Sequence, residues 1–203
     1  MTRASELIAY LLASVAIFTV WACGSNGDNT AAIPRREAFA RPMLYAKEYR
    51  PLPDSIPLVM EINAYPVLEI ERRNGGIYWI TQHYPAYGID IYYTLTPAHG
   101  QDDATAAWQR SMQRMSDNTG GMPVRHVSAT SPSGFQHDLT IASDINPFPV
   151  QFVSTDRRNW IVSAAATYTG GKLPASYDSI YPVLKALEQD IAHTLNTMDH
   201  AKN

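Results

Sequence analysis

Cysteine is nearly absent from this sequence, because Cys23 is the only one among 203 residues. A single thiol excludes an intramolecular disulfide framework and any zinc site built from several cysteines. Charge of either sign is also scarce, since 16 Lys and Arg residues against 19 Asp and Glu residues give a net charge of -3. Without a positive excess the chain has little attraction for a nucleic-acid backbone, so we expect no nucleic-acid partner.

Catalytic signatures are missing as well. The sequence has no GxSxG nucleophile elbow, HExxH zinc motif, Walker loop or GxGxxG dinucleotide motif. The six histidines show no metal-ligand spacing, and His193 lies off the apolar face of the last predicted helix, where we expect it to be solvated. A Ser-His-Asp arrangement of Ser133, His137 and Asp138 is explained by chance, because these residue types are common. We therefore expect no catalytic residue, no metal, no cofactor and no enzymatic activity.

The amino terminus has the pattern of a bacterial lipoprotein precursor. Arg3 supplies a positive charge, residues 7–20 form an apolar run, and the small Ala22 precedes Cys23. The run is shorter than the roughly 20 residues that span a bilayer, but it suits a signal peptide. A cysteine directly after a small residue at the end of such a run is typical of a lipobox.

The lipobox predicts a signal peptide over residues 1–22 and lipidation of Cys23 by acyl chains such as palmitate. Several acyl chains on one residue give lasting anchorage, where a single chain is marginal. Residues 23–34 then form a flexible tether, and residues 35–203 a single folded domain. The alternatives are an uncleaved signal anchor or cleavage elsewhere, because Trp21 is bulky where a lipobox has a small residue.

The first part of the folded region is rich in proline. Residues 35–57 contain closely spaced prolines that prevent long regular elements, so they predict an extended arm across the domain surface. Its aromatic and basic side chains either face a partner or pack onto the domain, and we expect packing. These side chains are Phe39, Arg41, Tyr45, Lys47, Tyr49 and Arg50.

Eight β-prone segments separated by turn residues are predicted. They cover residues 58–62, 67–71, 77–82, 88–95, 124–129, 135–141, 150–155 and 160–168. Asn74-Gly75 at the centre of the turn at 73–76 predicts a type I′ hairpin. His137 alternates with apolar residues, so we expect it to be buried and hydrogen-bonded to the backbone. One face of the last segment holds Trp160, Val162, Ala164, Ala166 and Tyr168.

Two amphipathic helices are predicted. The apolar face of the first holds Ala104, Trp108, Met112 and Met115. We expect Asp102 or Asp103 to cap it and Gly120-Gly121 to end it. The apolar face of the second holds Ile180, Leu184, Leu187, Ile191, Leu195 and Met198. We expect Ser176 or Asp178 to cap the second helix, with Pro182 in its first turn.

These elements predict an α+β fold: a mainly antiparallel sheet with the amphipathic helices packed on it. The small Ala164 and Ala166 in the last strand invite close approach by a helix, for which the final helix is the candidate. The order of elements is also similar to the Mog1/PsbP-type α/β/α sandwich, where a late hairpin leads into a final packing helix.

One predicted turn has the composition of an interaction surface. Residues 156–159 form a charged hairpin tip with Arg157 and Arg158, and Trp160 follows directly. Exposed arginine near an aromatic residue is enriched at protein interfaces, so Arg157, Arg158 and Trp160 are the predicted partner-binding residues. The alternative is a solvated hairpin tip that blocks aggregation through a strand edge.

The carboxy-terminal part carries a family resemblance. Its markers are a QF-x-x-TD strand, a DS-x-x-PV helix start and an acidic-aliphatic-x-His step, which here are Gln151, Phe152, Thr155, Asp156, Asp178, Ser179, Pro182, Val183, Asp190, Ile191 and His193. A W-x-x-x-x-YP…SY region upstream matches Tyr78-Trp79-Ile80, Tyr84-Pro85 and Ile91-Tyr92-Tyr93. On these residues the chain resembles the gliding-motility lipoprotein D (GldD) family. It departs from that family at the alanines 164–166, where bulkier residues are usual.

The resemblance implies an accessory lipoprotein of the gliding machinery and the linked type IX secretion system. Such proteins sit in the cell envelope, attached to the outer membrane, with other envelope proteins as partners, and the family offers no accepted catalytic residues. Because Asp28 is the one acid shortly after Cys23, an acidic surface-export signal is missing and we expect the periplasmic face. The alternative is a tethered lipid- or small-ligand-binding domain, whose pocket would be lined by Trp79, Tyr84, Tyr87, Tyr92 and Tyr93.

Overall fold

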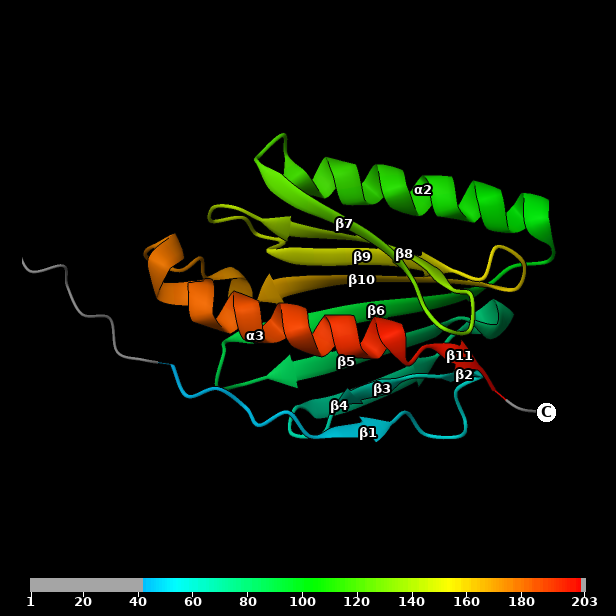
Figure 1. The fold of residues 1–203 in the computed structure, drawn as a ribbon, viewed down its shortest axis with the longest axis horizontal. Helices are drawn as coiled ribbons and strands as arrows, with labels where there is room; N and C mark the ends of the chain where they lie inside the picture. Colours follow the sequence, from blue (N-terminus) through cyan, green and yellow to red (C-terminus); the bar gives the residue numbers. More distant parts are fainter. Residues whose placement is uncertain (1–41, 202–203) are drawn as a thin grey trace, which may run out of the picture. The chain divides into compact units, whose positions relative to one another are not determined.

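The computed structural model describes residues 42–201. Its centre is a seven-stranded antiparallel sheet with the strand order β4-β5-β6-β10-β9-β8-β7 (Figure 1). The strands are β4 (Val67–Arg72), β5 (Tyr78–Tyr84), β6 (Ile89–Pro97), β7 (Val124–Thr130), β8 (Gln136–Ala142), β9 (Val150–Thr155) and β10 (Trp160–Tyr168). Two small sheets pair β1 (Tyr49–Pro51) with β3 (Glu61–Asn63), and β2 (Leu58–Val59) with β11 (Asp199–His200).

Two runs of hairpins build the sheet. β4, β5 and β6 are neighbours in space as in sequence, and so are β7, β8, β9 and β10. The two runs meet where β6 pairs with β10, from the Trp160/Pro97 pair to the Tyr168/Ile89 pair. Short turns join the other neighbours, whereas this central pairing closes over α2 (Gln101–Thr119) and three strands.

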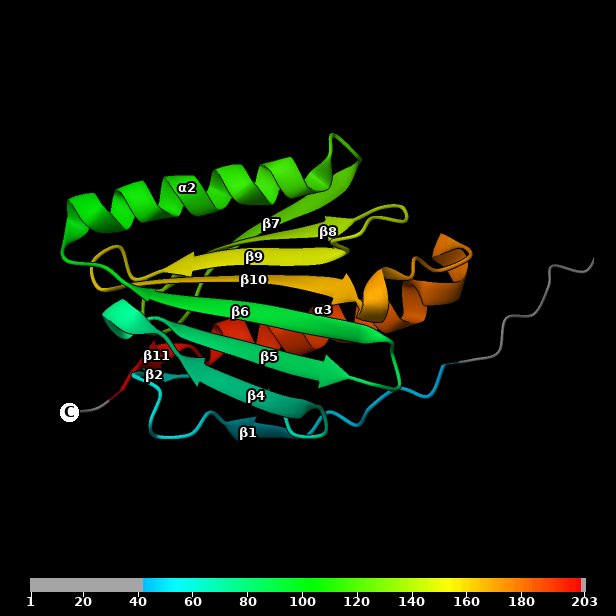
Figure 2. The same cartoon turned by 180° about the vertical axis from the view of Figure 1, so that it is seen from behind.

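One helix packs on each face of the sheet. α2 lies against β9 and β10, and α3 (Tyr177–Asn196) lies on the opposite face, against β9 and β3. Alternation along β9 divides the two sides, because Phe152 belongs to the main core under α3 and Val153 to a smaller cluster under α2. α3 lies in front of the sheet in Figure 1 and behind it in Figure 2, which is the view from the other side. The predicted α+β class is confirmed, and the likeness to Mog1/PsbP proteins stays a prediction.

The alternation in the sequence places the core correctly. Phe135, His137, Leu139 and Ile141 are all buried, as their common face predicts. The same holds in β10, where Ala164 and Ala166 join the cluster that contains Leu184 and Leu187 of α3. Small side chains in this strand leave room for the larger residues of the helix.

α2 starts earlier than its aspartates suggest. Gly100, with φ of 103°, is the N-cap, so the expected cap at Asp102 or Asp103 is wrong. Asp103 instead accepts a hydrogen bond from the backbone N–H of His99 at 3.0 Å. Gly120 ends the helix in the left-handed conformation with φ of 60°, as predicted.

α3 follows its predicted face closely. Ser176 is the N-cap and its hydroxyl accepts the backbone N–H of Ser179 at 3.3 Å. The helix already begins at Tyr177, so Pro182 lies beyond the first turn, contrary to expectation. Its missing N–H removes one intrahelical bond on an exposed side of the helix. No helix within residues 42–201 is long and apolar enough to cross a bilayer.

The β4–β5 turn forms a hairpin of another type than predicted. Arg73 N donates to Ile77 O at 2.8 Å, which closes a three-residue loop. Gly75 and Gly76 have φ of 76° and 73°, but Asn74 is not in the left-handed region, so the predicted type I′ turn centred on Asn74-Gly75 is excluded. Glycine is needed at these two positions because other residues rarely adopt this backbone conformation.

α2 leaves half of its side of the sheet uncovered. Trp79 of β5 and Tyr92 of β6 alternate with core residues, point to the α2 side, and are 47% and 48% exposed. In Figure 2, β4, β5 and β6 lie in front of α3 with no helix drawn across them. The sheet therefore has one face that holds the main core and one face that is half open.

We expect Leu187→Ala to lower the free energy of unfolding by about 2–5 kcal/mol, because it removes a fully buried side chain and leaves a cavity. Tyr181→Ala, at an exposed position of the same helix, should change it by less than about 0.5 kcal/mol. Urea denaturation of the two purified variants tests this. Equal effects would contradict the assignment of the core side of α3.

Candidate functional site

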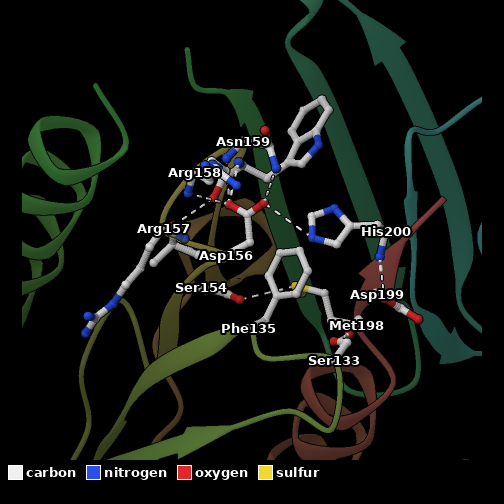
Figure 3. Close-up of polar contacts among 12 residues, drawn as sticks. Ser133, Phe135, Ser154, Asp156, Arg157, Arg158, Asn159, Met198, Asp199 and His200 are labelled. Atoms are coloured by element: carbon white, nitrogen blue, oxygen red, sulfur yellow. Dashed lines mark hydrogen bonds and ion pairs between the residues drawn. The ribbon is translucent and has the colours of Figure 1, made fainter. Parts of the chain in front are cut away.

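The hairpin between β9 and β10 is organised by one carboxylate. Asp156 Oδ1 accepts the backbone N–H groups of Arg158, Asn159 and Trp160 at 2.9, 2.7 and 2.9 Å. Its Oδ2 accepts Asn159 Nδ2 at 2.9 Å and lies 3.4 Å from His200 Nε2 (Figure 3). The Asp156 side chain is 6% exposed, so this carboxylate is part of the fold beneath the turn rather than of the surface.

The surroundings of Asp156 favour its charged form. Burial alone would raise the pKa of this carboxyl, but the hydrogen bonds from Arg158, Trp160 and Asn159 outweigh it and hold the pKa below its ordinary value. A lowered pKa means that the ionised carboxylate is stabilised more in the folded protein than in the unfolded chain. The turn is therefore stabilised by charge at neutral pH.

The hairpin is also tied to the start of α2. Ala98 N donates to Asn159 O at 2.6 Å, and Gly100 N donates to Arg158 O at 3.1 Å. Within the turn, the Thr155 hydroxyl donates to Trp160 O at 2.9 Å and accepts Arg157 N at 2.8 Å. These bonds fix the backbone that carries the two arginines.

Arg157 stands at the most unusual backbone position of the hairpin. It is the one non-glycine residue between 42 and 201 in the left-handed region, with φ of 60°. Arg157 and Arg158 are both exposed. Such a conformation persists only where the surrounding bonds impose it, and this pattern recurs at functional sites.

A groove of about 380 Å³ adjoins Arg157. It runs between the amino-terminal half of α2 and the strands β8 and β9. Its lining residues are Gln101, Ala104, Thr105, Trp108, Gln136, Asp138, Thr155 and Arg157. A cationic rim over an aromatic and amide-lined groove is a surface suited to another protein.

Trp160 does not share this surface. It is half-buried and packs against the main core on the α3 side of the sheet, whereas Arg157 borders the groove on the α2 side. The structure thus brings Arg157 and Arg158 together and separates Trp160 from the groove. Sequence proximity misled here, because residues that leave a turn alternate between the two faces of a sheet.

Cys23 and the segments predicted as signal peptide and tether lie outside the described residues. The same is true of Phe39 and Arg41 of the predicted arm. Their predictions rest on the sequence alone.

Ser133, His137 and Asp138 do not form a triad. The Ser133 hydroxyl bonds to Met198 O, and the buried His137 ring contacts the Ser154 hydroxyl at 2.8 Å through Nδ1. Asp138 contacts Ser128 at the other face of the strand. Burial lowers the pKa of His137 to about 4, so its ring is neutral at physiological pH. Its Nδ1 thus bonds to a side chain, and a backbone hydrogen bond with Leu195 opposes the lowering of the His137 pKa.

A buried carboxylate fastens the arm to α3. Asp190 is 5% exposed and accepts hydrogen bonds from Tyr49 Oη and Asn63 Nδ2, each at 3.0 Å. A longer bond of 3.4 Å comes from Tyr84 Oη. Burial raises the pKa of Asp190 above its ordinary value, although these donors oppose the shift. The described part of the arm therefore packs onto the domain, as expected.

His193 completes this anchor. Its ring stacks on Tyr49 with centroids 3.7 Å apart, and its Nε2 lies 2.7 Å from Glu61 Oε2. His193 is therefore half-buried, with 32% of its side chain exposed, rather than fully solvated as predicted, since the arm and β3 cover part of that side of α3. Sequence reasoning also missed Asp190, although its place three residues after Leu187 put it on the buried face of the helix.

The residues that carry the family resemblance hold structural positions. Thr155 and Asp156 build the hairpin, and Asp190 and His193 hold the arm. Gln151 binds α2, accepting Asn118 Nδ2 at 2.7 Å and donating to Met115 O at 3.4 Å. The shared pattern thus specifies how the hairpin, α2 and the arm attach to the sheet.

The aromatic pocket considered from the sequence is split by the sheet. Tyr84, Tyr87 and Tyr93 belong to the main core on the α3 side. Trp79 and Tyr92 stand exposed on the opposite side. These five residues therefore line no common cavity. In addition, no group of three or more His, Cys, Asp or Glu side chains that could hold a metal ion occurs within residues 42–201.

We expect Asp156→Asn to destabilise the protein by about 1–3 kcal/mol at neutral pH, because the amide accepts the turn N–H groups more weakly than the carboxylate does. The contribution of the carboxylate is complete above the pKa of an unfolded aspartate, about 3.9, and is lost as pH falls through the lower folded pKa. Urea denaturation of both proteins from neutral to strongly acidic pH measures it. A difference that persists in strong acid would contradict this assignment.

Comparison with known proteins assigns the chain to a family. A model of the family described as gliding motility lipoprotein GldD matches residues 29–200, which include the arm, the hairpin and α3. No curated protein and no solved structure matches the chain. The family is one of lipoproteins of gliding motility, which associates the protein with the cell envelope and the gliding machinery. The chain belongs to the GldD family of gliding motility lipoproteins.

Proposed function

We propose that the protein is a non-enzymatic accessory subunit of the gliding motility and type IX secretion machinery. It is anchored to the outer membrane through lipidated Cys23, faces the periplasm, and acts by binding other envelope proteins. Family membership supports the gliding role. The lipobox before Cys23 supports the anchor.

The rigid presentation of Arg157 and Arg158 carries the binding part of this proposal. Two exposed arginines on a flexible loop would lose conformational entropy on binding. Here the turn is fixed by Asp156 and by backbone bonds to the start of α2, so less entropy is lost. Arginine is also among the residues that contribute most to protein interfaces.

The anchoring of the arm fits a tethered binding subunit. The path from Cys23 enters the described domain at residue 42, and Tyr45 packs against Tyr87 with ring centroids 4.9 Å apart. Tyr49 follows, bonded to Asp190. The described part of the arm is thus held to the domain at both Tyr45 and Tyr49.

We expect the double substitution Arg157→Glu/Arg158→Glu to reduce recovery of gliding and type IX secretion components about tenfold, because like charges are placed at a complementary contact. In-cell crosslinking and pull-down of the tagged protein, with quantitative mass spectrometry, measures the recovery. Arg110→Glu/Lys172→Glu changes the net charge equally at exposed positions away from the hairpin and should recover the wild-type set. Equal losses in both variants would remove the hairpin from the binding surface.

We expect Cys23→Ala to abolish incorporation of labelled palmitate and to move the protein from the membrane to the soluble fraction, because the anchor is lost. Labelling and fractionation of cells measure both effects. Retention in the membrane fraction without label would favour an uncleaved signal anchor instead.

A further inference from the structure

The carboxy-terminal strand β11 connects the end of α3 to the 156–160 hairpin. It follows Thr197, the C-cap of α3, whose hydroxyl accepts the backbone N–H of Glu61 at 3.0 Å. Both residues of β11 then pair with β2. Figure 1 shows β11 beside β2 at the carboxy-terminal end of α3. The path of the chain beyond α3 is therefore fixed by the first part of the domain.

Met198 fastens the start of this strand to the sheet. Its side chain is 1% exposed and belongs to the main core. The Ser154 hydroxyl of β9 donates to Met198 Sδ at 3.2 Å, and the Ser133 hydroxyl donates to Met198 O (Figure 3). Ser154 lies two residues before Asp156, so β11 is held against the strand that enters the hairpin.

His200 brings β11 into contact with the carboxylate of the hairpin. Its ring centroid lies 5.1 Å from that of Phe135, and its Nε2 lies 3.4 Å from Asp156 Oδ2 (Figure 3). The same Oδ2 accepts Asn159 Nδ2 at 2.9 Å, while Oδ1 accepts three backbone N–H groups of the turn. His200 thus reaches the one side chain that fixes the backbone of the turn.

The His200 ring helps to keep water away from this carboxylate. Asp156 is 6% exposed, although Arg157, Arg158 and Asn159 around it are all exposed. Hydrogen bonds to a charged group are stronger where water is excluded, because water screens the charge and competes for the same donors. Removal of the ring would open the Oδ2 side of Asp156 to water and weaken the bonds that hold the turn.

We propose that β11 positions the partner-binding hairpin, with His200 as a positioning residue that acts through Asp156. This inference rests on the proposed role of Arg157 and Arg158 in binding, and it makes the geometry of that surface depend on the carboxy-terminal strand. The His200 side chain is itself 45% exposed, so its replacement opens no cavity in the core and leaves the fold intact.

Hydrogen–deuterium exchange of the full-length protein, followed by mass spectrometry, tests the positioning role. We expect His200→Ala to speed exchange of the 156–160 amides about tenfold, because the N–H groups that bond to Asp156 open more often. His200→Phe keeps a ring over the carboxylate and should exchange close to the wild-type rate. His126→Ala, a matched change at an exposed position of β7, should leave these amides unchanged.

The β4–β5 hairpin shows whether the effect is local. Faster exchange at 156–160 that is matched at 73–77 reflects general destabilisation and overturns the inference. Unchanged exchange in His200→Ala also overturns it, and so do equal rates in His200→Ala and His200→Phe.

Recovery of partners by in-cell crosslinking and pull-down tests the link to binding. We expect His200→Ala to lower the recovery about threefold and His200→Phe to retain it. Unchanged recovery in His200→Ala, while Arg157→Glu/Arg158→Glu loses its partners, rejects this inference alone. Wild-type recovery in Arg157→Glu/Arg158→Glu rejects the hairpin as a binding surface, and with it the proposed function on which the inference rests.

Discussion

The pairing of β6 with β10 holds the two halves of the sheet together and places the 156–160 hairpin beside α2. It joins the two runs of hairpins into one sheet, and the register puts Trp160 opposite Pro97. The 156–160 hairpin therefore lies next to the connection into α2, where Ala98 and Gly100 bond to its backbone. Without this pairing the arginines would sit on an isolated turn, and α2 would have no β9–β10 surface to cover.

Two carboxylates fix separate attachments within the domain. Asp156 gathers backbone N–H groups and shapes the surface of the hairpin. Asp190 gathers side-chain donors from the arm, β3 and β5, and so ties the amino-terminal segment to α3. Both are largely buried, and both are satisfied by donors from several elements. The cost of burying each carboxylate is offset only when the elements that donate to it are in place. The positions of the hairpin and of the arm therefore depend on the whole fold.

The two sides of the sheet differ in how completely they are covered. The α3 side holds a continuous core that includes Tyr84, Phe152 and Leu187. On the other side α2 covers β9 and β10, and Trp79 and Tyr92 stay exposed. A seven-stranded sheet is wider than one helix, so a single helix on a face leaves part of that face for solvent or for a partner.

Local patterns in the sequence determined the elements and their buried sides. Alternation over 135–141 and the three-four spacing from Ile180 to Leu195 gave the faces of β8 and α3 correctly, because the period of apolar residues reports which side avoids water. Only the tertiary structure decided which residues pack against each buried side. Trp160 and Arg157 lie on opposite faces of the sheet. Asp190 and His193 contact Tyr49 of the arm, which is about 140 positions away in the sequence. Periodicity carries no information on such distant partners, since they depend on strand register and on helix packing across the whole domain.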